Sequence, residues 1–359
     1  MKIKLSLLFL LFYLMPFAQT SSVSIDQFLP APVAGSFSMD QYWVWGASVV
    51  EVEGKYHMYA TRVPMKYKFH PGWMVASEIV HATSDKLEGP YAFESVVLPA
   101  RGAEYWDGLS TYNPQVMQHK GRLYLYYGGT RHPYPTPTDQ ELTLPSKWCI
   151  SSRFNKRIGV AIANSPYGPW KRSNKPALDV EPNTFYSYLT SNPAPVILPD
   201  GQVYMLFKGR AGLAEGKHSR MQLGVAYAKS PEEPFDVLNG NKPVFKLEGQ
   251  GEAEDPYLWH EDGYFYTVFK DQVGDYTGER GAGVKAYSKD CINWTICKPA
   301  KAYSKKITWQ DGKVSTQGNL ERPFIFFKDG KPRCFFFATM DGSGFNGKKA
   351  FNIVLPLKQ

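Results

Sequence analysis

The sequence is poor in cysteine, which excludes both a dense disulfide framework and a cysteine-based metal site. Its 359 residues include only Cys149, Cys291, Cys297 and Cys334, and their spacing matches no metal motif. Cys291 and Cys297 could pair in an oxidising compartment. Six residues of extended strand, however, would hold them too far apart to do so easily. We therefore expect buried free thiols.

Clusters of positive charge and long apolar runs are also missing. The basic residues are scattered, which argues against a nucleic-acid partner. Beyond the N-terminal segment, no run approaches the roughly 18 apolar residues that cross a bilayer, so we expect a soluble protein with no membrane partner. Long helical patterns are absent because 31 Gly and 27 Pro are spread along the chain.

The N-terminus has the features of a secretory signal. Lys2 and Lys4 precede an apolar run from Leu5 to Leu14, and Pro16-Phe17-Ala18 offers a small-residue cleavage site. The run is too short for a membrane anchor. We predict a signal peptide over 1–18, cleavage near Ala18 and a secreted or periplasmic protein. Losing Lys2 and Lys4 lowers the formal charge from the +8 of the whole sequence, but the remainder stays basic and suits an anionic ligand.

Aromatic residues are abundant, at 15% of the sequence, and a pattern built on them recurs five times. Each copy begins with a polar residue, which a proline usually follows. An apolar stretch, a turn with glycine and then alternating aromatics come next. Each is typical of two strands joined by a tight turn. The equivalent positions, which we call the repeat heads, are Gly46, Asn113, Asn192, Asp255 and Arg322.

A shorter motif between these copies predicts a second hairpin in each unit. Examples are Ala82-Thr83-Ser84 leading to Gly89-Pro90-Tyr91 and Ala163-Asn164-Ser165 leading to Gly168-Pro169-Trp170. Four strands per unit and five units predict an all-β fold, a five-bladed β-propeller of four antiparallel strands per blade, over a single domain at 19–359. The first strand of each blade then lines the central channel, so the heads converge on one funnel.

The heads and their flanks supply two kinds of candidate residue. Two carboxylates that face one cleft are what glycoside hydrolysis requires, and Glu254 and Glu321 occupy equivalent places on neighbouring blades. Asp107 and Asp255 are further catalytic candidates. Candidate substrate-binding residues at or near the heads are Trp45, Tyr112, Asn113, Asn192 and Arg322.

A cationic set follows the second strands. It suits a carboxylate or sulfate on a sugar, although any one member can equally form a salt bridge between blades. The candidates are Arg62, His70, His132, Lys208, Arg210 and Lys270, and Arg131, Asp271 and Arg280 lie in the same regions.

The heads resemble those of the five-bladed glycoside hydrolases, notably glycoside hydrolase family 43, over essentially the whole sequence after residue 18. That family has Asp-Pro at the first head as base, Asp-Pro at the third as pKa modulator, and Glu-Gly-Pro at the fourth as acid. Glu254-Asp255-Pro256 matches the acid position, so the resemblance implies that Glu254 is the general acid. Asn192-Pro193 replaces the modulator and Gly46-Ala47 lacks the base. No cofactor is implied, and a structural cation in the channel is left open, as in some related propellers.

Three functions stay open at this point. The first is a hydrolase of plant or algal oligosaccharides, with Asp107, Asp255 or Glu321 as base. It would be exo-acting, because the long segments 62–80, 128–157 and 208–222 are expected to build a rim that closes the funnel. The second is a lyase or dehydratase that eliminates across a terminal uronic acid, with the cations neutralising its carboxylate. The third is a sugar-binding propeller without catalysis.

Overall fold

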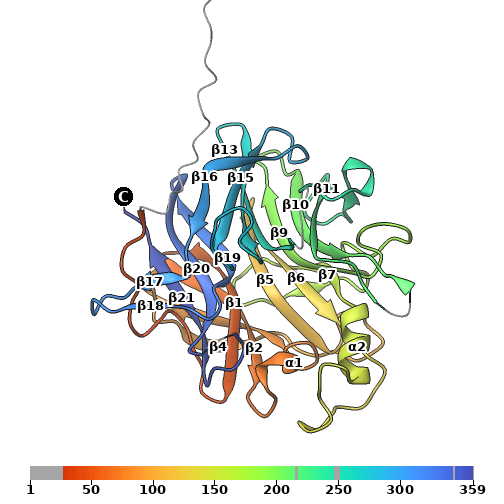
Figure 1. Ribbon diagram of the computed structural model, residues 1–359. Coiled ribbons are helices and arrows are strands. Elements are labelled where there is room, and N and C mark those ends of the chain that lie inside the picture. The colour runs from red at the N-terminus through yellow and green to blue at the C-terminus, as the bar shows by residue number, and fades with distance from the viewer. Residues whose placement is uncertain (1–26, 215–216, 246–250, 343, 359) are drawn as a thin grey trace, which may run out of the picture.

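The computed structural model describes residues 27–214, 217–245, 251–342 and 344–358. The predicted signal segment, 1–18, lies outside these residues. Five β-sheets are arranged around a common centre, and each follows the previous one in sequence (Figure 1). The predicted five-bladed β-propeller is thus confirmed.

Each of the first four blades is an antiparallel meander of four strands in sequence order. The first blade comprises β1 (Tyr42–Val52), β2 (Lys55–Pro64), β3 (Glu78–Ser84) and β4 (Ala92–Leu98). The second comprises β5 (Ser110–His119), β6 (Arg122–Thr130), β7 (Arg157–Ala163) and β8 (Lys171–Arg172). The third comprises β9 (Leu189–Ile197), β10 (Val203–Arg210), β11 (Gln222–Ala228) and β12 (Asp236–Val237). The fourth comprises β13 (Ala253–Glu261), β14 (Tyr264–Asp271), β15 (Gly283–Ser288) and β16 (Thr295–Tyr303).

The fifth blade is completed by a segment from the other end of the molecule. It has three strands, β19 (Glu321–Lys328), β20 (Lys331–Met340) and β21 (Ala350–Pro356). Isolated bridges join Phe28 to Leu357 and Phe37 to Asn352 in antiparallel fashion, so the segment before β1 lies along the edge of β21. A small hairpin, β17 (Lys306–Thr308) and β18 (Val314–Thr316), precedes this blade.

The helical elements are short and lie outside the blades. They are α1 (Phe69–Gly72), α2 (Lys147–Phe154) and a 3₁₀ turn at Asn239–Asn241. The segment after α1 packs on α2, since Met74 and Val75 share one apolar cluster with Trp148 and Cys149. None of the described helices is long and apolar enough to cross a membrane.

The predicted tight turns between the first two strands of each blade are confirmed. Each turn contains a glycine with φ between 71° and 101°. A tight turn of this kind needs a residue in the left-handed conformation, which glycine adopts without strain. These glycines are Gly54, Gly121, Gly201, Gly263 and Gly330.

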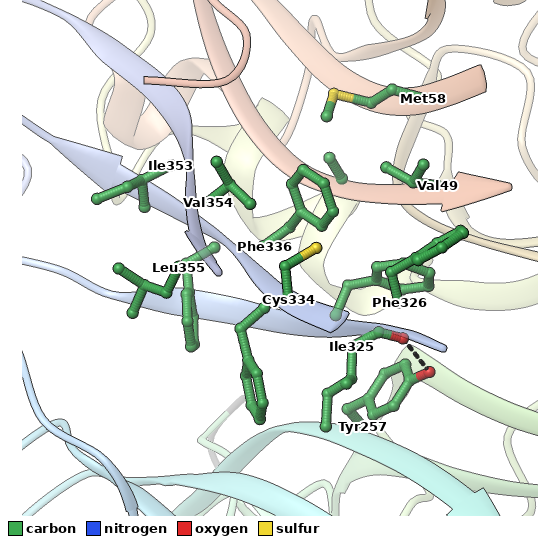
Figure 2. Packing of buried hydrophobic residues seen from close by; sticks show 14 of the residues in the cluster. Val49, Met58, Tyr257, Ile325, Phe326, Cys334, Phe336, Ile353, Val354 and Leu355 are labelled. Carbon is green, nitrogen blue, oxygen red and sulfur yellow. Dashed lines mark hydrogen bonds between the residues drawn. The ribbon is translucent and has the colours of Figure 1, made fainter. Parts of the chain in front are cut away.

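The aromatic excess is buried between the blades. Figure 2 shows the largest cluster, in which Met58 of the first blade packs with Phe336 and Val354 of the fifth. The Tyr257 hydroxyl of the fourth blade donates to the Ile325 carbonyl of the fifth at 2.7 Å, so this buried hydroxyl finds its partner across the interface between the blades. All four cysteines are buried free thiols, as expected.

Candidate active site

The five repeat heads form a ring across the central channel. Each head lies where the register between the first and second strands of its blade shifts. Every head has a positive φ, 20° for Gly46 and between 52° and 56° for the other four. Such bulges re-aim side chains relative to a regular strand. The equivalence of the five heads inferred from the sequence is therefore also present in the backbone geometry.

Hydrogen bonds connect four members of the ring. Asn113 Nδ2 donates to Asn192 Oδ1 at 3.1 Å, and Asn192 Nδ2 donates to Asp255 Oδ1 at 2.9 Å. The Arg322 guanidinium is ion-paired with the same Asp255 carboxylate, whose other oxygen accepts the Arg322 main-chain N–H at 3.2 Å. Gly46 leaves room for this arginine, because a Cβ at that position would lie 3.0 Å from Arg322 Cγ.

The ring does not suit a structural cation. Its single carboxylate, Asp255, is already paired with Arg322, and the other side-chain donors are two amides. No group of three or more His, Cys, Asp or Glu residues that could hold a metal occurs in the described parts of the sequence. A hard cation prefers several oxygen ligands. Here the Arg322 guanidinium already occupies the place in the channel beside the Asp255 carboxylate.

A larger cavity, of about 770 Å³, adjoins this ring. Asn113 and Arg322 line both the ring channel and the cavity. The residues immediately before four of the heads also reach it, together with the ends of second strands and several loops. The described residues that carry chemistry there are Trp45, Phe69, His70, Trp73, Tyr112, Arg153, Lys156, Lys208, Arg210, His218, Glu254, Lys270, Gln272, Arg280, Lys305, Asn319, Glu321, Arg322 and Phe345.

Two glutamates from neighbouring blades face this cavity, and each is held by a lysine from the blade before. Lys208 Nζ, on β10, donates to Glu254 Oε1 at 2.5 Å, and Gln272 Nε2 donates to Glu254 Oε2 at 2.6 Å. Lys270, on β14, forms the corresponding ion pair with Glu321 on β19. The repeat therefore places the same Lys–Glu pair at two blade boundaries.

The Glu254 carboxylate is ionised in the free protein. Burial by itself would raise its pKa, but the positive charges of Lys208, Arg322 and Lys270 outweigh burial and lower the pKa below its usual range. In this state Glu254 can accept a proton or stabilise positive charge, and it must gain a proton before it can donate one.

The cavity wall is strongly cationic. Among the described lining residues there are eight Lys or Arg and only two Glu. Two of the eight pair with those glutamates, and Arg210 NH2 lies 3.2 Å from Glu252. Lys156, which follows α2, is 4% exposed, and its Nζ lies 4.0 Å from the centre of the Trp73 ring. This excess of positive charge favours an anionic occupant.

Neutral histidine and flat aromatic rings complete the wall. Burial, followed by the charges of Lys156 and Arg153, lowers the pKa of His70, so its imidazole is neutral near pH 7. His70 packs edge-on against Phe345 at 5.2 Å, and Trp45 lies 6.0 Å from the same ring. Such rings can stack on the apolar faces of a sugar.

The structure brings most of the predicted site residues together. Ten of them line the cavity: Trp45, His70, Tyr112, Asn113, Lys208, Arg210, Glu254, Lys270, Glu321 and Arg322. Asn192 and Asp255 lie in the ring instead. Their side chains form hydrogen bonds with each other, with Asn113 and with Arg322.

Three predicted residues lie elsewhere. Asp107 is fully buried between Arg101, Arg172 and Tyr127, whose hydroxyl donates to it at 2.7 Å, so its carboxylate has structural partners and does not line the cavity. Arg62 pairs with Glu78 at 2.9 Å on the first blade. His132 is buried beside Tyr134. Nearness to a head for Asp107, and a position after a second strand for Arg62 and His132, did not reveal where these side chains point.

Several lining residues were missed by sequence reasoning. Arg153 and Lys156 come from α2 and the residues after it, His218 from the loop after β10, and Lys305 from the loop after β16. The only signal for Arg153, Lys156 and His218 was membership of the long segments 128–157 and 208–222, and Lys305 lies in none of the long segments singled out from the sequence. The segments 62–80, 128–157 and 208–222, predicted to build the rim, do contribute lining residues.

No protein-family model matches this sequence, and no curated protein matches it either. Solved structures do match its fold. A complex of BT0996 with RGII is 14% identical with a TM-score of 0.66, over 94% of this protein and 93% of that one. Zg3597, a family 117 glycoside hydrolase of the marine bacterium Zobellia galactanivorans, is 17% identical with a TM-score of 0.65, over 94% and 91%. A thermostable family-43 glycoside hydrolase is 13% identical with a TM-score of 0.59, over 90% and 93%.

These similarities define the architecture as the five-bladed propeller found in glycoside hydrolases. The resemblance stated from the repeat heads is confirmed at the level of the fold. At such low identity the chemistry must be argued from the cavity itself.

Proposed function

We propose that the protein is a glycoside hydrolase that cleaves anionic oligosaccharides of plant or algal origin. The observation that carries this proposal is the pair of carboxylates, Glu254 and Glu321, presented by adjacent blades to one cavity with aromatic walls. Two carboxylates on either side of a glycosidic bond are the usual requirement for hydrolysis, one donating a proton to the leaving oxygen and one activating water or attacking the sugar.

Glu254 is our candidate for the general acid and Glu321 for the base. In the free protein Glu254 is held ionised by Lys208 and its neighbours. A negatively charged substrate group near these cations would weaken their effect on Glu254 and raise its pKa, which favours the protonated form required of an acid. Glu321, ion-paired with Lys270 on the neighbouring blade, would then act as the base.

An anionic substrate is supported by the imbalance of eight basic and two acidic lining residues. Arginine and lysine bind carboxylates and sulfates through charge-assisted hydrogen bonds. Attack at the end of an oligosaccharide is supported by the loops that close the cavity on several sides, since α1, α2 and the loop after β10 all contribute to its wall. We further propose, from the N-terminal segment, that the protein is exported to the periplasm or secreted.

The test is to incubate residues 19–359 with acidic and neutral plant and algal oligosaccharides and to follow product masses. Hydrolysis splits an oligosaccharide with the gain of one water. Glu254→Gln should abolish cleavage, whereas Glu261→Gln, on the same strand but outside the cavity, should leave it unchanged. Normal turnover by Glu254→Gln would exclude Glu254 as the acid. Measurable affinity with no change in mass would identify a binding protein instead.

Elimination on a uronic acid is a second candidate, favoured by the neutral His70 in the cationic wall. The cations would neutralise the uronate and acidify the neighbouring C–H. The imidazole would take that proton, the C–H electron pair would form the C=C bond, and the glycosidic or hydroxyl oxygen would leave with its own bonding pair. The product would be an unsaturated uronate that absorbs in the ultraviolet. Its formation, together with its loss in His70→Gln, would replace hydrolysis as the proposed reaction.

A further inference from the structure

Lys156 differs from the other buried lysines of the cavity in having no acidic partner. Lys208 and Lys270 each form an ion pair with a glutamate. Lys156 is 4% exposed and lines the cavity, yet it forms no hydrogen bond or ion pair through its amine with any residue that the structure describes. Its Nζ lies over the Trp73 ring, 4.0 Å from the centre, and 5.9 Å from the centre of Tyr112.

The groups that face Lys156 are mostly positive. Lys208 from β10, Arg153 from α2 and Arg322 from β19 act on it most strongly, and Glu254 on β13, the acid that acts on it, is already engaged by Lys208. His70, from α1, is also within electrostatic range. A buried ammonium surrounded by cations is costly unless an anion joins it. An aromatic face compensates only in part.

We propose that Lys156 is the specificity residue of the cavity and that its amine binds the carboxylate or sulfate of the sugar substrate. Contact with the Trp73 ring, which becomes a cation–π interaction once the amine is protonated, holds the amine within the aromatic wall against which a pyranose can stack. This proposal relies on the proposed function only for placing a sugar in the cavity, and it holds for either hydrolysis or elimination.

Binding of the anion should be coupled to the uptake of a proton. Burial, then the charges of Lys208, Arg153 and Arg322, lower the pKa of Lys156 well below its usual value in the free protein. A bound anion stabilises the ammonium and raises that pKa again. Between the free and bound values, a neutral amine and a proton from solution combine into the ammonium that holds the anion, so affinity falls as the pH rises through this window.

The experiment is calorimetric titration at a series of pH values between about 6 and 10, each in two buffers with different ionisation enthalpies, which gives the number of protons taken up and the pH window in which the uptake occurs. The probes are sodium D-galacturonate for a carboxylate, sodium sulfate for a sulfate, and D-galactose as the neutral reference. We expect the wild-type protein to bind at least one anionic probe with proton uptake. The probe that binds more tightly identifies the anionic group.

Two substitutions separate recognition from folding. Lys156→Met keeps the apolar stem and should weaken binding of the anion at least about thirtyfold, with no proton uptake. Lys156→Arg keeps the charge without a titrating amine, so it should retain binding but lose the uptake. Lys328→Met, an exposed lysine paired with Glu51 on the blade surface, is the matched control and should behave as wild type.

Several results would overturn this assignment. They are failure of the wild type to bind either anion, unchanged anion affinity in Lys156→Met, or proton uptake that persists in that variant. Oligosaccharide cleavage by Lys156→Met with an unchanged preference for acidic substrates would refute it while leaving the proposed function intact. Conversely, proton-coupled binding by a wild-type protein that cleaves nothing would refute the proposed function alone.

Discussion

Glu254 and Asp255 are neighbours in sequence and both are buried carboxylates, yet they belong to different parts of the molecule. Glu254 faces the cavity and contacts Lys208 and Gln272. Asp255, in the left-handed conformation at the bulge, points into the ring and pairs with Arg322 and Asn192. The same division holds for Tyr112 and Asn113, where the first has its ring in the cavity wall and the second bonds to Asn192. In both pairs the side chain of the head holds the ring together, although Asn113 also reaches the cavity, and the residue before the head faces the cavity alone.

The sharpest test of this division compares the variants Glu254→Gln and Asp255→Asn, in which an amide replaces each carboxylate. We expect Glu254→Gln to lower turnover by about 10²–10⁴-fold, because the amide cannot transfer a proton. Steady-state kinetics on a cleaved oligosaccharide measure the effect. A larger loss of turnover in Asp255→Asn than in Glu254→Gln would contradict the division.

Asp255→Asn should instead act mainly on stability. It leaves the Arg322 guanidinium buried without its counter-charge, which costs about 3–5 kcal/mol. Chemical denaturation followed by tryptophan fluorescence measures the free energy of unfolding. The double variant Asp255→Asn with Arg322→Met should recover part of the loss, since no unpaired charge is then buried. Failure of the double variant to recover any stability would contradict the ion-pair explanation.

Gly46→Ala tests the empty position in the ring. The added Cβ would lie 3.0 Å from Arg322 Cγ and 3.3 Å from Asn113 Oδ1, at a φ of 20° that disfavours alanine. We expect a loss of about 1–3 kcal/mol in unfolding free energy. Gly54→Ala serves as a comparison, because it shares the positive φ but meets no atom within 4 Å and should cost less.

The smallest expected effect is a gain in stability in the Lys156→Met variant. Lys156 has a lowered pKa in the folded protein, so between that value and about 10.4 the unfolded protein binds more protons and stability rises with pH. Lys156→Met removes this dependence and should raise stability near pH 7 by about 0.5–2 kcal/mol while impairing anion binding. Thermal denaturation from pH 7 to 10 measures the change in stability and its pH dependence. An unchanged pH profile in this variant would show that the buried amine does not destabilise the fold.

The fold was predictable because its repeat depends on residues that restrict the backbone locally. Glycine at hairpin turns and proline after most of the heads recur at nearly constant intervals, and both residues restrict the backbone in ways that do not depend on distant contacts. The convergence of Glu254 and Glu321 on one cavity followed from that repeat, since equivalent positions on a ring face the same centre.

The rest of the cavity could not be predicted, because it depends on side-chain direction and on loops. Asp107 lies just before β5, yet Arg101 and Arg172 hold it away from the cavity. Lys156 lies beyond a helix in a long connection, and only packing of that helix against the segment after α1 places it. Neither direction nor loop packing leaves a periodic trace in the sequence.

The edge contact between the segment before β1 and β21 has a consequence for folding. Phe28 bridges Leu357, so the earliest and the latest described parts of the protein must meet before the fifth blade has its full edge. During synthesis from the N-terminus the first four blades can form in order, but the circle stays open until β21 arrives. Such long-range closure makes folding slow and the finished ring cooperative. Loss of the final strand should therefore release the N-terminal edge as well and expose both ends to proteolysis together.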